Sequence, residues 1–341
     1  MPELHLAVII PSTLNAPQLS YLQRAISSIT LAQKGNRSVV TTVCVVSSQR
    51  PSRRLKEKHP EVFFIKAPRG AGFAELNNVA LEFLRTFFSV KAARHPDFLL
   101  LLNDDARLQP DFYIELQRIE ASATKRRNRA DIYAPLIFDA NHPTMIDSFG
   151  VEYFRSGYAK NCRNKKVATT LTTAGCEVIR WTFVQKFLSA YGFFFNPLYF
   201  YYLEDVDFSI RALMIGAKIE RASTLKALHH GSITSGGKQN TFSLRFTYRN
   251  ILWVILCCWP AGMILRNLPN ILFVQAWVMI YSTIRCGLLC YPNLLFQTVL
   301  FLPELLQARR KIVTAYTAHD FEALLSPFSF RTFHDKTVPA L

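Results

Sequence analysis

The first hundred residues alternate between short apolar runs and segments with helical periodicity. The apolar runs cover residues 6–10, 39–46, 63–65 and 98–102. They are rich in β-branched, leucine and phenylalanine side chains, which predicts buried strands. Apolar residues recur at helical spacing over residues 19–29 and 74–90, which predicts helices between these strands. This alternation predicts an α/β fold with a mostly parallel sheet that carries helices on both faces.

The middle of the chain adds further strands before the composition changes. Residues 131–138, 176–181 and 219–228 are strand-like and are separated by polar loops. We therefore predict an α/β domain over residues 1–248, with one half at about 1–130 and the other at about 131–248. An apolar helical region with a tail is predicted over residues 249–341.

The region after residue 249 is apolar enough to meet lipid. Between Ile251 and Pro303 the only formally charged residues are Arg266 and Arg285. The uncharged runs on either side of Arg285 are close to the shortest length that spans a bilayer core. Because prolines and arginines interrupt them, interfacial or re-entrant helices fit at least as well as spanning helices. A hydrophobic dimer interface is the soluble alternative.

Composition and charge narrow the choice of partners. Of the 341 residues, 50% are hydrophobic, and the mean hydropathy of +0.12 is high for a protein without lipid contact. The formal net charge of +16 suits an anionic membrane surface, a polyphosphate substrate or nucleic acid. The sequence has no zinc-finger or helix-turn-helix spacing, which argues against nucleic acid. The cysteines are odd in number and lack framework spacing, so we expect a reducing compartment and no cysteine metal site.

Two carboxylates follow the last of the N-terminal strands. Asn103, Asp104 and Asp105 come directly after the apolar run 98–102. Ligands of α/β sheets bind at the carboxyl ends of the strands, and one or two carboxylates there hold a hard divalent cation together with substrate phosphates. A turn before Pro110 is the alternative explanation. We favour a metal and nucleotide site, because a turn needs only one such residue.

A second acidic cluster closes an aromatic segment. Residues 193–202 are almost entirely aromatic or apolar, and Glu204, Asp205 and Asp207 follow them. Ionised carboxylates beside buried apolar side chains are costly unless they are paired, protonated or bound to a cation. A capped helix start is the alternative, with Asp207 and Arg211 as a surface ion pair. By itself, the segment supports these two interpretations equally.

Two more polar segments are candidates for ligand contact. Gly70 and Gly72 precede a predicted helix, so the backbone can approach an anion there, although their spacing fits no phosphate-binding fingerprint. His229 and His230 are candidate metal ligands or phosphate contacts, with an exposed histidine pair as the alternative. The small-residue loop 231–237 that follows is a candidate flap over a substrate.

Taken in order, these motifs resemble those of the inverting family 2 glycosyltransferases with a GT-A fold, and within them the rhamnosyltransferase-like branch that builds bacterial surface polysaccharides. The resemblance covers roughly residues 4–265. The matching residues are Ile10-Pro11, Gly72-Phe73-Ala74 with Asn78, Leu102-Asn103-Asp104-Asp105, Tyr202-Leu203-Glu204-Asp205-Val206-Asp207 with Arg211 and Gly216, His229-His230-Gly231-Ser232, and Arg249-Asn250. The most specific part is the two acidic motifs, which lie about a hundred residues apart.

The resemblance implies roles for the residues at the donor. Asp105 would hold Mg²⁺ or Mn²⁺ at the diphosphate of a nucleotide sugar, with Asp104 or Asn103 near the ribose. His229 or His230 would complete the metal or phosphate contacts. Other residues that the resemblance places at the nucleotide sugar are Pro11, Gly72 and Asn78.

For the acceptor, the resemblance implies a general base. Asp205 would take a proton from the acceptor hydroxyl as it attacks the anomeric carbon, and Glu204 and Asp207 would shape that site. A single displacement inverts the anomeric configuration, so no covalent nucleophile is expected. The resemblance also makes residues 1–130 the nucleotide-sugar half and residues 131–248 the acceptor half of a glycosyltransferase domain.

The sequence departs from the family pattern in two places. Relatives usually carry an acid at the end of the second strand to hold the nucleobase, whereas this chain has Ser47-Ser48-Gln49. The asparagine expected before the Gly72 motif is replaced by Gly70. The identity of the base therefore stays open.

The sequence as a whole predicts a metal-dependent inverting glycosyltransferase. It would move a rhamnose-like sugar or another hexose from a nucleotide diphosphate sugar to a glycan or lipid-linked glycan acceptor, in surface polysaccharide synthesis. We expect a peripheral or monotopic protein on the cytoplasmic face of the inner membrane, without nucleic acid as a partner, and a homodimer remains open. The alternative is a catalytically diverged, membrane-associated scaffold of a glycan assembly complex, supported by the changed nucleobase region.

Overall fold

The structure is a computed structural model of the whole chain. It describes residues 3–36, 38–90, 94–169, 171–231, 241–314, 322 and 325–327. Apart from Gly231, the loop predicted as a flap lies outside the described residues.

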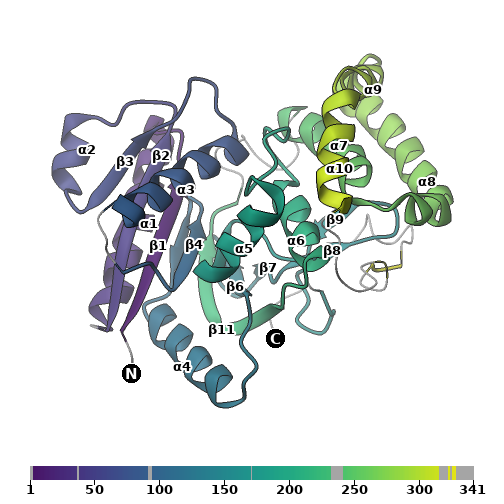
Figure 1. Ribbon diagram of the computed structural model, residues 1–341. Coiled ribbons are helices and arrows are strands. Elements are labelled where there is room, and N and C mark those ends of the chain that lie inside the picture. Colours follow the sequence, from purple (N-terminus) through teal and green to yellow (C-terminus); the bar gives the residue numbers. More distant parts are fainter. Residues whose placement is uncertain are drawn as a thin grey trace.

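One large sheet forms the centre of the molecule (Figure 1). Its strands have the order β3-β2-β1-β4-β10-β6-β11-β5, with β7 paired to β6, and β8 and β9 form a separate pair. The strands are β1 Leu4–Pro11, β2 Val39–Ser47, β3 Val62–Lys66, β4 Phe98–Leu102, β5 Ala106–Leu108, β6 Ile132–Asp139, β7 Ile146–Ser148, β8 Val151–Tyr153, β9 Ala159–Asn161, β10 Cys176–Arg180 and β11 Ile219–His229. Every strand predicted from an apolar run is present.

The directions of the strands make this a mixed sheet. β1 is parallel to both β2 and β4, β2 is parallel to β3, and β6 is parallel to β11. β10 runs antiparallel to its neighbours β4 and β6. β5 runs antiparallel to β11, and β7 runs antiparallel to β6. The α/β prediction is therefore confirmed, whereas parallel order holds for the N-terminal strands and for β6 with β11 and not for β10, β5 and β7. A buried apolar strand carries no sign of the direction of its neighbours, which is why the antiparallel direction of β10 was not foreseen.

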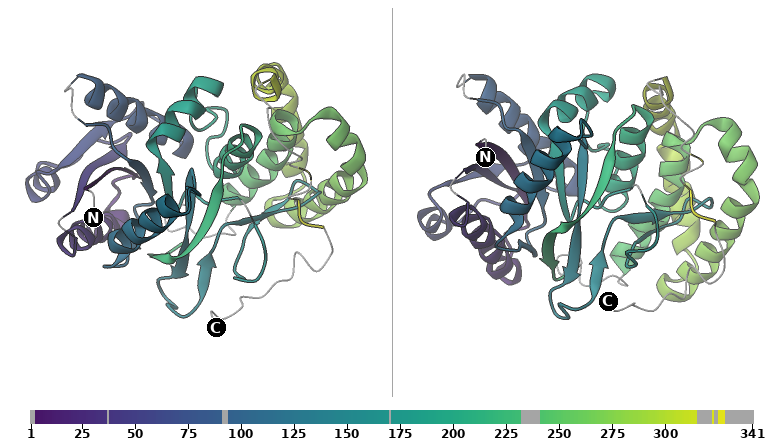
Figure 2. Two further views of the ribbon diagram at one scale, coloured as in Figure 1. Left: turned by 60° about the horizontal axis from the view of Figure 1, so that its bottom comes forward. Right: turned by 90° about the horizontal axis from the view of Figure 1, so that it is seen from below.

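Helices cover both faces of the sheet, as predicted (Figure 2). The first six helices are α1 Ala16–Lys34, α2 Arg53–Lys58, α3 Phe73–Val90, α4 Phe112–Lys125, α5 Trp181–Tyr191 and α6 Glu204–Met214. Successive residues of β1 alternate between two cores: Val8 packs with α1, α2 and α4, and Ile9 packs with α3, α5 and α6. This alternation follows from the pleat of the strand, which turns neighbouring side chains to opposite faces.

The last four helices gather at the end of the molecule opposite β1 to β3 (Figure 1). They are α7 Thr241–Cys258, α8 Ala261–Cys286, α9 Cys290–Leu300 and α10 Leu302–Thr314. The domain boundary expected at residue 248 falls inside α7. Among the described residues, α8 alone is long and apolar enough to cross a membrane by length and composition. Its most apolar stretch of 18 residues has a mean hydropathy of 1.3, and 33% of that stretch is buried inside the protein.

Candidate active site

The first acidic motif lies where β4 ends at the edge of the sheet. The backbone N–H of Asn103 donates to the carbonyl of Gly175, 3.0 Å away, which fixes the turn after β4. Asp104 is buried, and burial raises its pKa to about 7, although a hydrogen bond from Ser12 opposes this. Ser12 directly follows Pro11 at the end of β1, so the carboxyl ends of β1 and β4 meet at Asp104.

Sheet register brings His229 beside Asp105. The short strand β5 starts directly after Asp105 and pairs antiparallel with β11, so that Ala106 faces His229. Nε2 of His229 lies 3.1 Å from Oδ1 of Asp105, and Nδ1 lies 2.8 Å from Oδ2 of Asp147 on β7. Burial alone lowers the pKa of His229, but the two carboxylates outweigh it and raise this pKa to about 10.

This arrangement fits a divalent cation. Nε2 of His229 is buried and has no hydrogen-bond partner, although a carboxylate oxygen of Asp105 is close to it. A cation between the two would take the place of the Nε2 proton, while Asp147 would hold the ring through Nδ1. Among the described residues, no group of three or more acidic, histidine or cysteine side chains forms a complete ligand set. Mg²⁺ and Mn²⁺ need only one or two protein ligands when substrate phosphates supply the others.

The neighbouring histidine has a different environment. The ring of His230 packs edge-on against Tyr21, with 4.7 Å between the ring centroids. Burial and the positive charge of Arg107 lower its pKa. Its backbone N–H donates to the carbonyl of Asp105, 3.1 Å away. Of the two histidines that the sequence could not separate, His229 therefore has its ring at the Asp105 carboxylate.

The second acidic motif begins α6 after a strained turn. Tyr202 and Leu203 have φ angles of 70° and 63°, a left-handed conformation that is unfavourable for residues with a side chain. This turn places Glu204 and Asp205 on the first turn of α6. Burial raises the pKa of both carboxyls, and for Glu204 the charge of Asp205 adds to the effect. A carboxyl with a raised pKa is suited to general-base work near neutral pH.

Residues 173–175 join the two acidic motifs. On one side, the carbonyl of Gly175 accepts the N–H of Asn103. On the other side, Asp205 accepts hydrogen bonds from the Thr173 hydroxyl and the Ala174 backbone, which favour its charged form. One segment of three residues before β10 therefore touches both motifs, which lie about a hundred residues apart in the chain. Asp205 and the Asn103–Asp105 turn therefore lie on either side of one short segment.

The third acid of the cluster has a structural partner. Oδ2 of Asp207 lies 2.7 Å from Nε and 2.5 Å from Nη2 of Arg211. Both side chains are fully buried, so the surface pair considered from sequence is wrong. Arg211 also donates to the carbonyl of Phe194 and packs over Phe187. Asp207 thereby anchors α6 to the aromatic segment through Arg211.

Gly72 and Asn78 hold the aromatic segment in place. A Cβ on Gly72 would lie 2.2 Å from the carbonyl oxygen of Phe200, which itself accepts the N–H of Phe73 at 2.9 Å. The amide of Asn78 donates to the carbonyl of Phe195 at 2.7 Å and accepts its N–H at 2.9 Å. These contacts explain why both positions need their residue types. Their role at a nucleotide sugar stays a prediction.

Two buried acids at the site escaped the sequence analysis. Asp147 is hydrogen-bonded to the ring of His229. Glu177 on β10 accepts a hydrogen bond from the Thr172 hydroxyl. Burial raises the pKa of Glu177 to about 8, and the charge of Asp205 also raises it. Both acids sit on short strands of the middle segment. No motif surrounds Asp147, whereas the position of Glu177 within the apolar strand 176–180 is a signal that the sequence does contain.

We expect Asp147→Asn to weaken binding of Mn²⁺ about 10- to 100-fold, because the residue that orients a metal-bound histidine contributes that much. Titration of the purified protein with Mn²⁺, followed by electron paramagnetic resonance, measures this directly. Asp139→Asn is the matched control, since Asp139 caps the nearby turn through the N–H groups of Asn141 and His142. Equal Mn²⁺ affinity in the two variants would contradict the role of Asp147.

Comparison with known proteins places this geometry in a fold family. No protein-family model and no curated protein matches the chain. Among solved structures, GalNAc-T7 with UDP, GalNAc and Mn²⁺ superimposes with a TM-score of 0.50 at 17% identity, over 76% of this chain and 48% of that one. The chain has a GT-A fold. It spans about half the length of GalNAc-T7.

Two further solved structures are similar at lower scores. They are residues 1–349 of TarS from S. aureus, with a TM-score of 0.49, 14% identity and coverage of 94% of this chain and 83% of that one, and the mannosyltransferase PcManGT from Pyrobaculum calidifontis with GDP-Man and Mn²⁺, with a TM-score of 0.47, 12% identity and coverage of 91% and 85%. At these scores they add no argument about this chain.

Proposed function

We propose that the protein is a metal-dependent glycosyltransferase that uses a nucleotide diphosphate sugar. The observation that carries the proposal is the segment 173–175, which brings Asp205 and the Asn103–Asp105 turn to one edge of a GT-A sheet. His229 and Asp105 would hold Mg²⁺ or Mn²⁺, which neutralises charge on a leaving diphosphate. The raised pKa of Asp205 suits it to take a proton from an acceptor hydroxyl.

The proposed reaction is a single displacement with inversion. Asp205 is held by three hydrogen bonds, from Val206 N–H, Ala174 N–H and Thr173 hydroxyl, so it can act as a base without moving. Burial and the charge of Asp205 raise the pKa of Glu204, which lies beside it. A carboxyl that keeps its proton to a higher pH is suited to donate a hydrogen bond beside a carboxylate that acts as the base. The proposed donor sugar is rhamnose-like or another hexose.

The proposed setting is surface polysaccharide synthesis at the cytoplasmic face of a membrane, with a glycan or lipid-linked glycan as acceptor. The exposed apolar side chains of α8 and α9 and the net charge of +16 support the membrane part. The resemblance of the motifs supports the pathway.

A donor screen tests this function. The purified protein in detergent is offered a panel of nucleotide diphosphate sugars with Mn²⁺, and release of nucleoside diphosphate is measured. We expect release from one nucleotide class, and we expect excess chelator to abolish it. No release from any donor, together with an intact fold, would contradict the proposal and favour the scaffold alternative.

A further inference from the structure

The exposed apolar side chains of this protein are concentrated on α8, α9 and the turn between them. Most large hydrophobic residues that are exposed in the described part of the chain lie between residues 265 and 306. The most exposed of these are Leu265, Leu272, Ile284, Leu288, Leu289, Phe296, Val299 and Leu300. We call this set of eight residues the apolar face. A monomer in water rarely exposes so many large apolar side chains together, so the face has a partner.

The opposite side of α8 packs against the protein. Met263, Ile271, Val274, Val278 and Ser282 are buried and recur at helical spacing, so they form one stripe along the helix. The stripe forms part of the same core as α7. Because α8 is bound along its length on one side and exposed on the other, it cannot be surrounded by lipid without detaching from α7.

Charge selects the kind of partner. Residues 241–303 contain no aspartate and no glutamate, whereas Arg245, Arg266 and Arg285 on α7 and α8 are exposed. Arg310 and Lys311 add exposed positive charge on α10. Glu322 pairs with Arg266, and Glu304 lies in the first turn of α10. Positive charge is still in excess around the apolar face, which matches an anionic phospholipid bilayer, in which acyl chains lie beneath phosphates.

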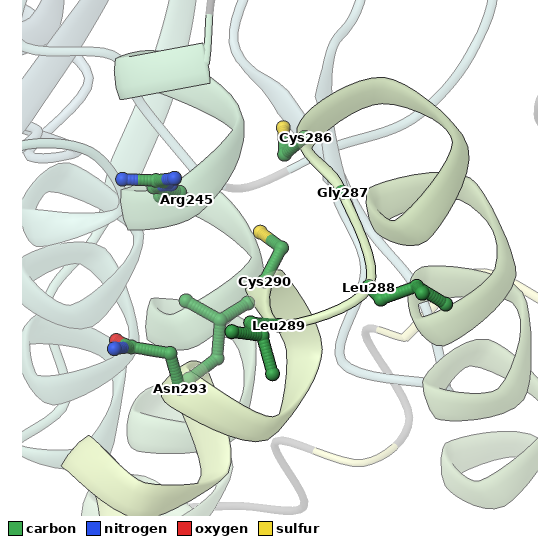
Figure 3. Close-up of a pocket in the computed structure, with 8 residues that line it drawn as sticks. Arg245, Cys286, Gly287, Leu288, Leu289, Cys290 and Asn293 are labelled. Atoms are coloured by element: carbon green, nitrogen blue, oxygen red, sulfur yellow. The ribbon is translucent and has the colours of Figure 1, made fainter.

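A pocket marks the place where the apolar and charged parts meet (Figure 3). It lies between α7 and the α8–α9 turn, and it is lined by Arg245 and Asn293 as well as by the apolar Leu288 and Leu289. Each of these leucines is 80% exposed. The pocket therefore has the two apolar side chains of the turn on one side and a guanidinium on the other, as a segment at the boundary between acyl chains and phosphates does.

We infer that the apolar face inserts into the surface of an anionic bilayer, with α8 lying in the plane of the membrane and not crossing it. This deepens the membrane contact in the proposed function, and it does not depend on the chemistry of the acidic site. A protein without transferase activity therefore still tests it.

Vesicle flotation with the full-length protein tests the contact. We expect binding to vesicles of phosphatidylcholine with phosphatidylglycerol, and at least tenfold weaker partitioning for Leu288→Gln with Leu289→Gln. Leu31→Gln with Val90→Gln is the matched control, since these residues are exposed on α1 and α3 and lie outside the apolar face. Absence of vesicle binding, or equal partitioning of the two double variants, would overturn the inference. A further contradicting result would be a dimer in solution that dissociates in the Leu288→Gln, Leu289→Gln double variant while its vesicle binding is unchanged. This result would show that a second copy of the chain covers the apolar face.

Spin labels measure the orientation of α8. Leu265, Leu272 and Ile284 are changed to cysteine one at a time in a Cys286→Ser background and carry a nitroxide. The outer two positions are about 28 Å apart along a helix, close to the thickness of a bilayer core. An in-plane helix gives similar depths at all three positions. A middle label that lies much deeper than both ends would show a spanning helix and overturn the inference.

A second inference concerns Asn250, which the sequence singled out together with Arg249. Asn250 is fully buried on α7, and its amide donates to the carbonyls of Tyr201 at 2.8 Å and Tyr202 at 2.7 Å. Its Oδ1 accepts a hydrogen bond from Nε of Arg249 at 3.0 Å. Nη1 of Arg249 donates a second hydrogen bond to Oε1 of Gln297 on α9 at 3.1 Å.

These contacts act on the turn that leads to the acids. Tyr202 and Leu203 have the left-handed backbone, which persists only where surrounding contacts hold it. The turn ends at Glu204 and Asp205. The geometry points to Asn250 as a positioning residue that sets where Asp205 stands. The kinetic test of this second inference rests on the proposed function, whereas its hydrogen-exchange test does not.

Asn250→Ala tests this role against a matched control. In the proposed transfer reaction we expect kcat to fall at least tenfold with the donor KM within about twofold, because donor binding does not use the turn. Hydrogen exchange at residues 204–206 should become at least tenfold faster. Asn267→Ala is the control, since Asn267 is also a buried helix asparagine that donates to a backbone carbonyl, that of Met263.

Unchanged exchange at residues 204–206 in a folded Asn250→Ala protein would overturn the second inference. So would equal effects of Asn250→Ala and Asn267→Ala, which would indicate general loss of stability. If Asn250→Ala does not fold, Gln297→Ala is the second variant. Gln297 is half-buried, and its loss removes the side-chain oxygen that accepts the hydrogen bond from Arg249. Hydrogen exchange at residues 204–206 should then also become faster. Hydrogen exchange can be measured even if the protein has no transferase activity. Failure of the proposed function can therefore be distinguished from failure of the second inference.

Discussion

Asp205→Asn is expected to lower the rate of sugar transfer by about 10²- to 10⁴-fold, the contribution of a well-placed general base. The amide keeps one acceptor oxygen for the N–H of Val206, and the Thr173 hydroxyl can turn to accept from the amide nitrogen. The fold and donor binding should therefore be retained. Steady-state kinetics with the donor found in the screen, together with calorimetric donor binding, measures both. An Asp205→Asn protein with full activity would remove Asp205 from the role of base.

The raised pKa of Asp205 also fixes the direction of the pH dependence. A base must be deprotonated to act, so kcat/KM should fall as the pH drops through a pKa above the ordinary range of aspartate. In Asp205→Asn this acidic limb should be absent from the residual activity. An acidic limb that is the same in the variant would assign the titration to another group.

Asp207→Asn is expected to lower the free energy of unfolding by about 3–5 kcal/mol. The change leaves the guanidinium of Arg211 fully buried without its carboxylate, and an uncompensated buried charge has this cost. Urea unfolding followed by circular dichroism measures the difference.

A second ion pair of the same spacing provides the control. Arg53 and Glu57 on α2 are also four residues apart but lie on the surface, with 93% and 61% of their side chains exposed. Glu57→Gln should therefore change the free energy of unfolding by less than about 1 kcal/mol. Similar losses in Asp207→Asn and Glu57→Gln would contradict the claim that the buried pair anchors α6.

Local pattern was sufficient to predict most elements of the fold. The strands β1, β2, β3 and β4 and the helices α1 and α3 follow from apolar runs and helical periodicity, which are properties of neighbouring residues. The short helix α2 was not predicted. The direction of β10 depends on pairing with β4 and β6, which are distant in sequence, and the pattern within β10 is silent about it. The mixed character of the sheet could not be predicted for this reason.

The site shows the same division. Asp105 and Asp205 could be found because each acid follows an apolar segment. The rule for strand ends covers Asp105, which follows β4, but not Asp205, which lies on the first turn of α6. The partner of His229 could not be found, since Asp147 reaches it only through the pairing of β7, β6 and β11. The burial of Asp207 with Arg211 was also missed, because helical spacing alone does not distinguish a surface pair from a buried one.

The proposed function requires that the edge of the sheet at Asp105 and His229 binds a nucleoside diphosphate together with a divalent cation. Isothermal calorimetry with UDP, GDP, ADP and dTDP, each with Mn²⁺ and then with excess chelator, measures this binding. We expect at least one diphosphate to bind the wild-type protein with Mn²⁺, and we expect chelator or His229→Ala to abolish this binding. Binding that is unchanged by chelator and by His229→Ala, or no binding of any diphosphate, would show that this edge is not a metal-dependent nucleotide site.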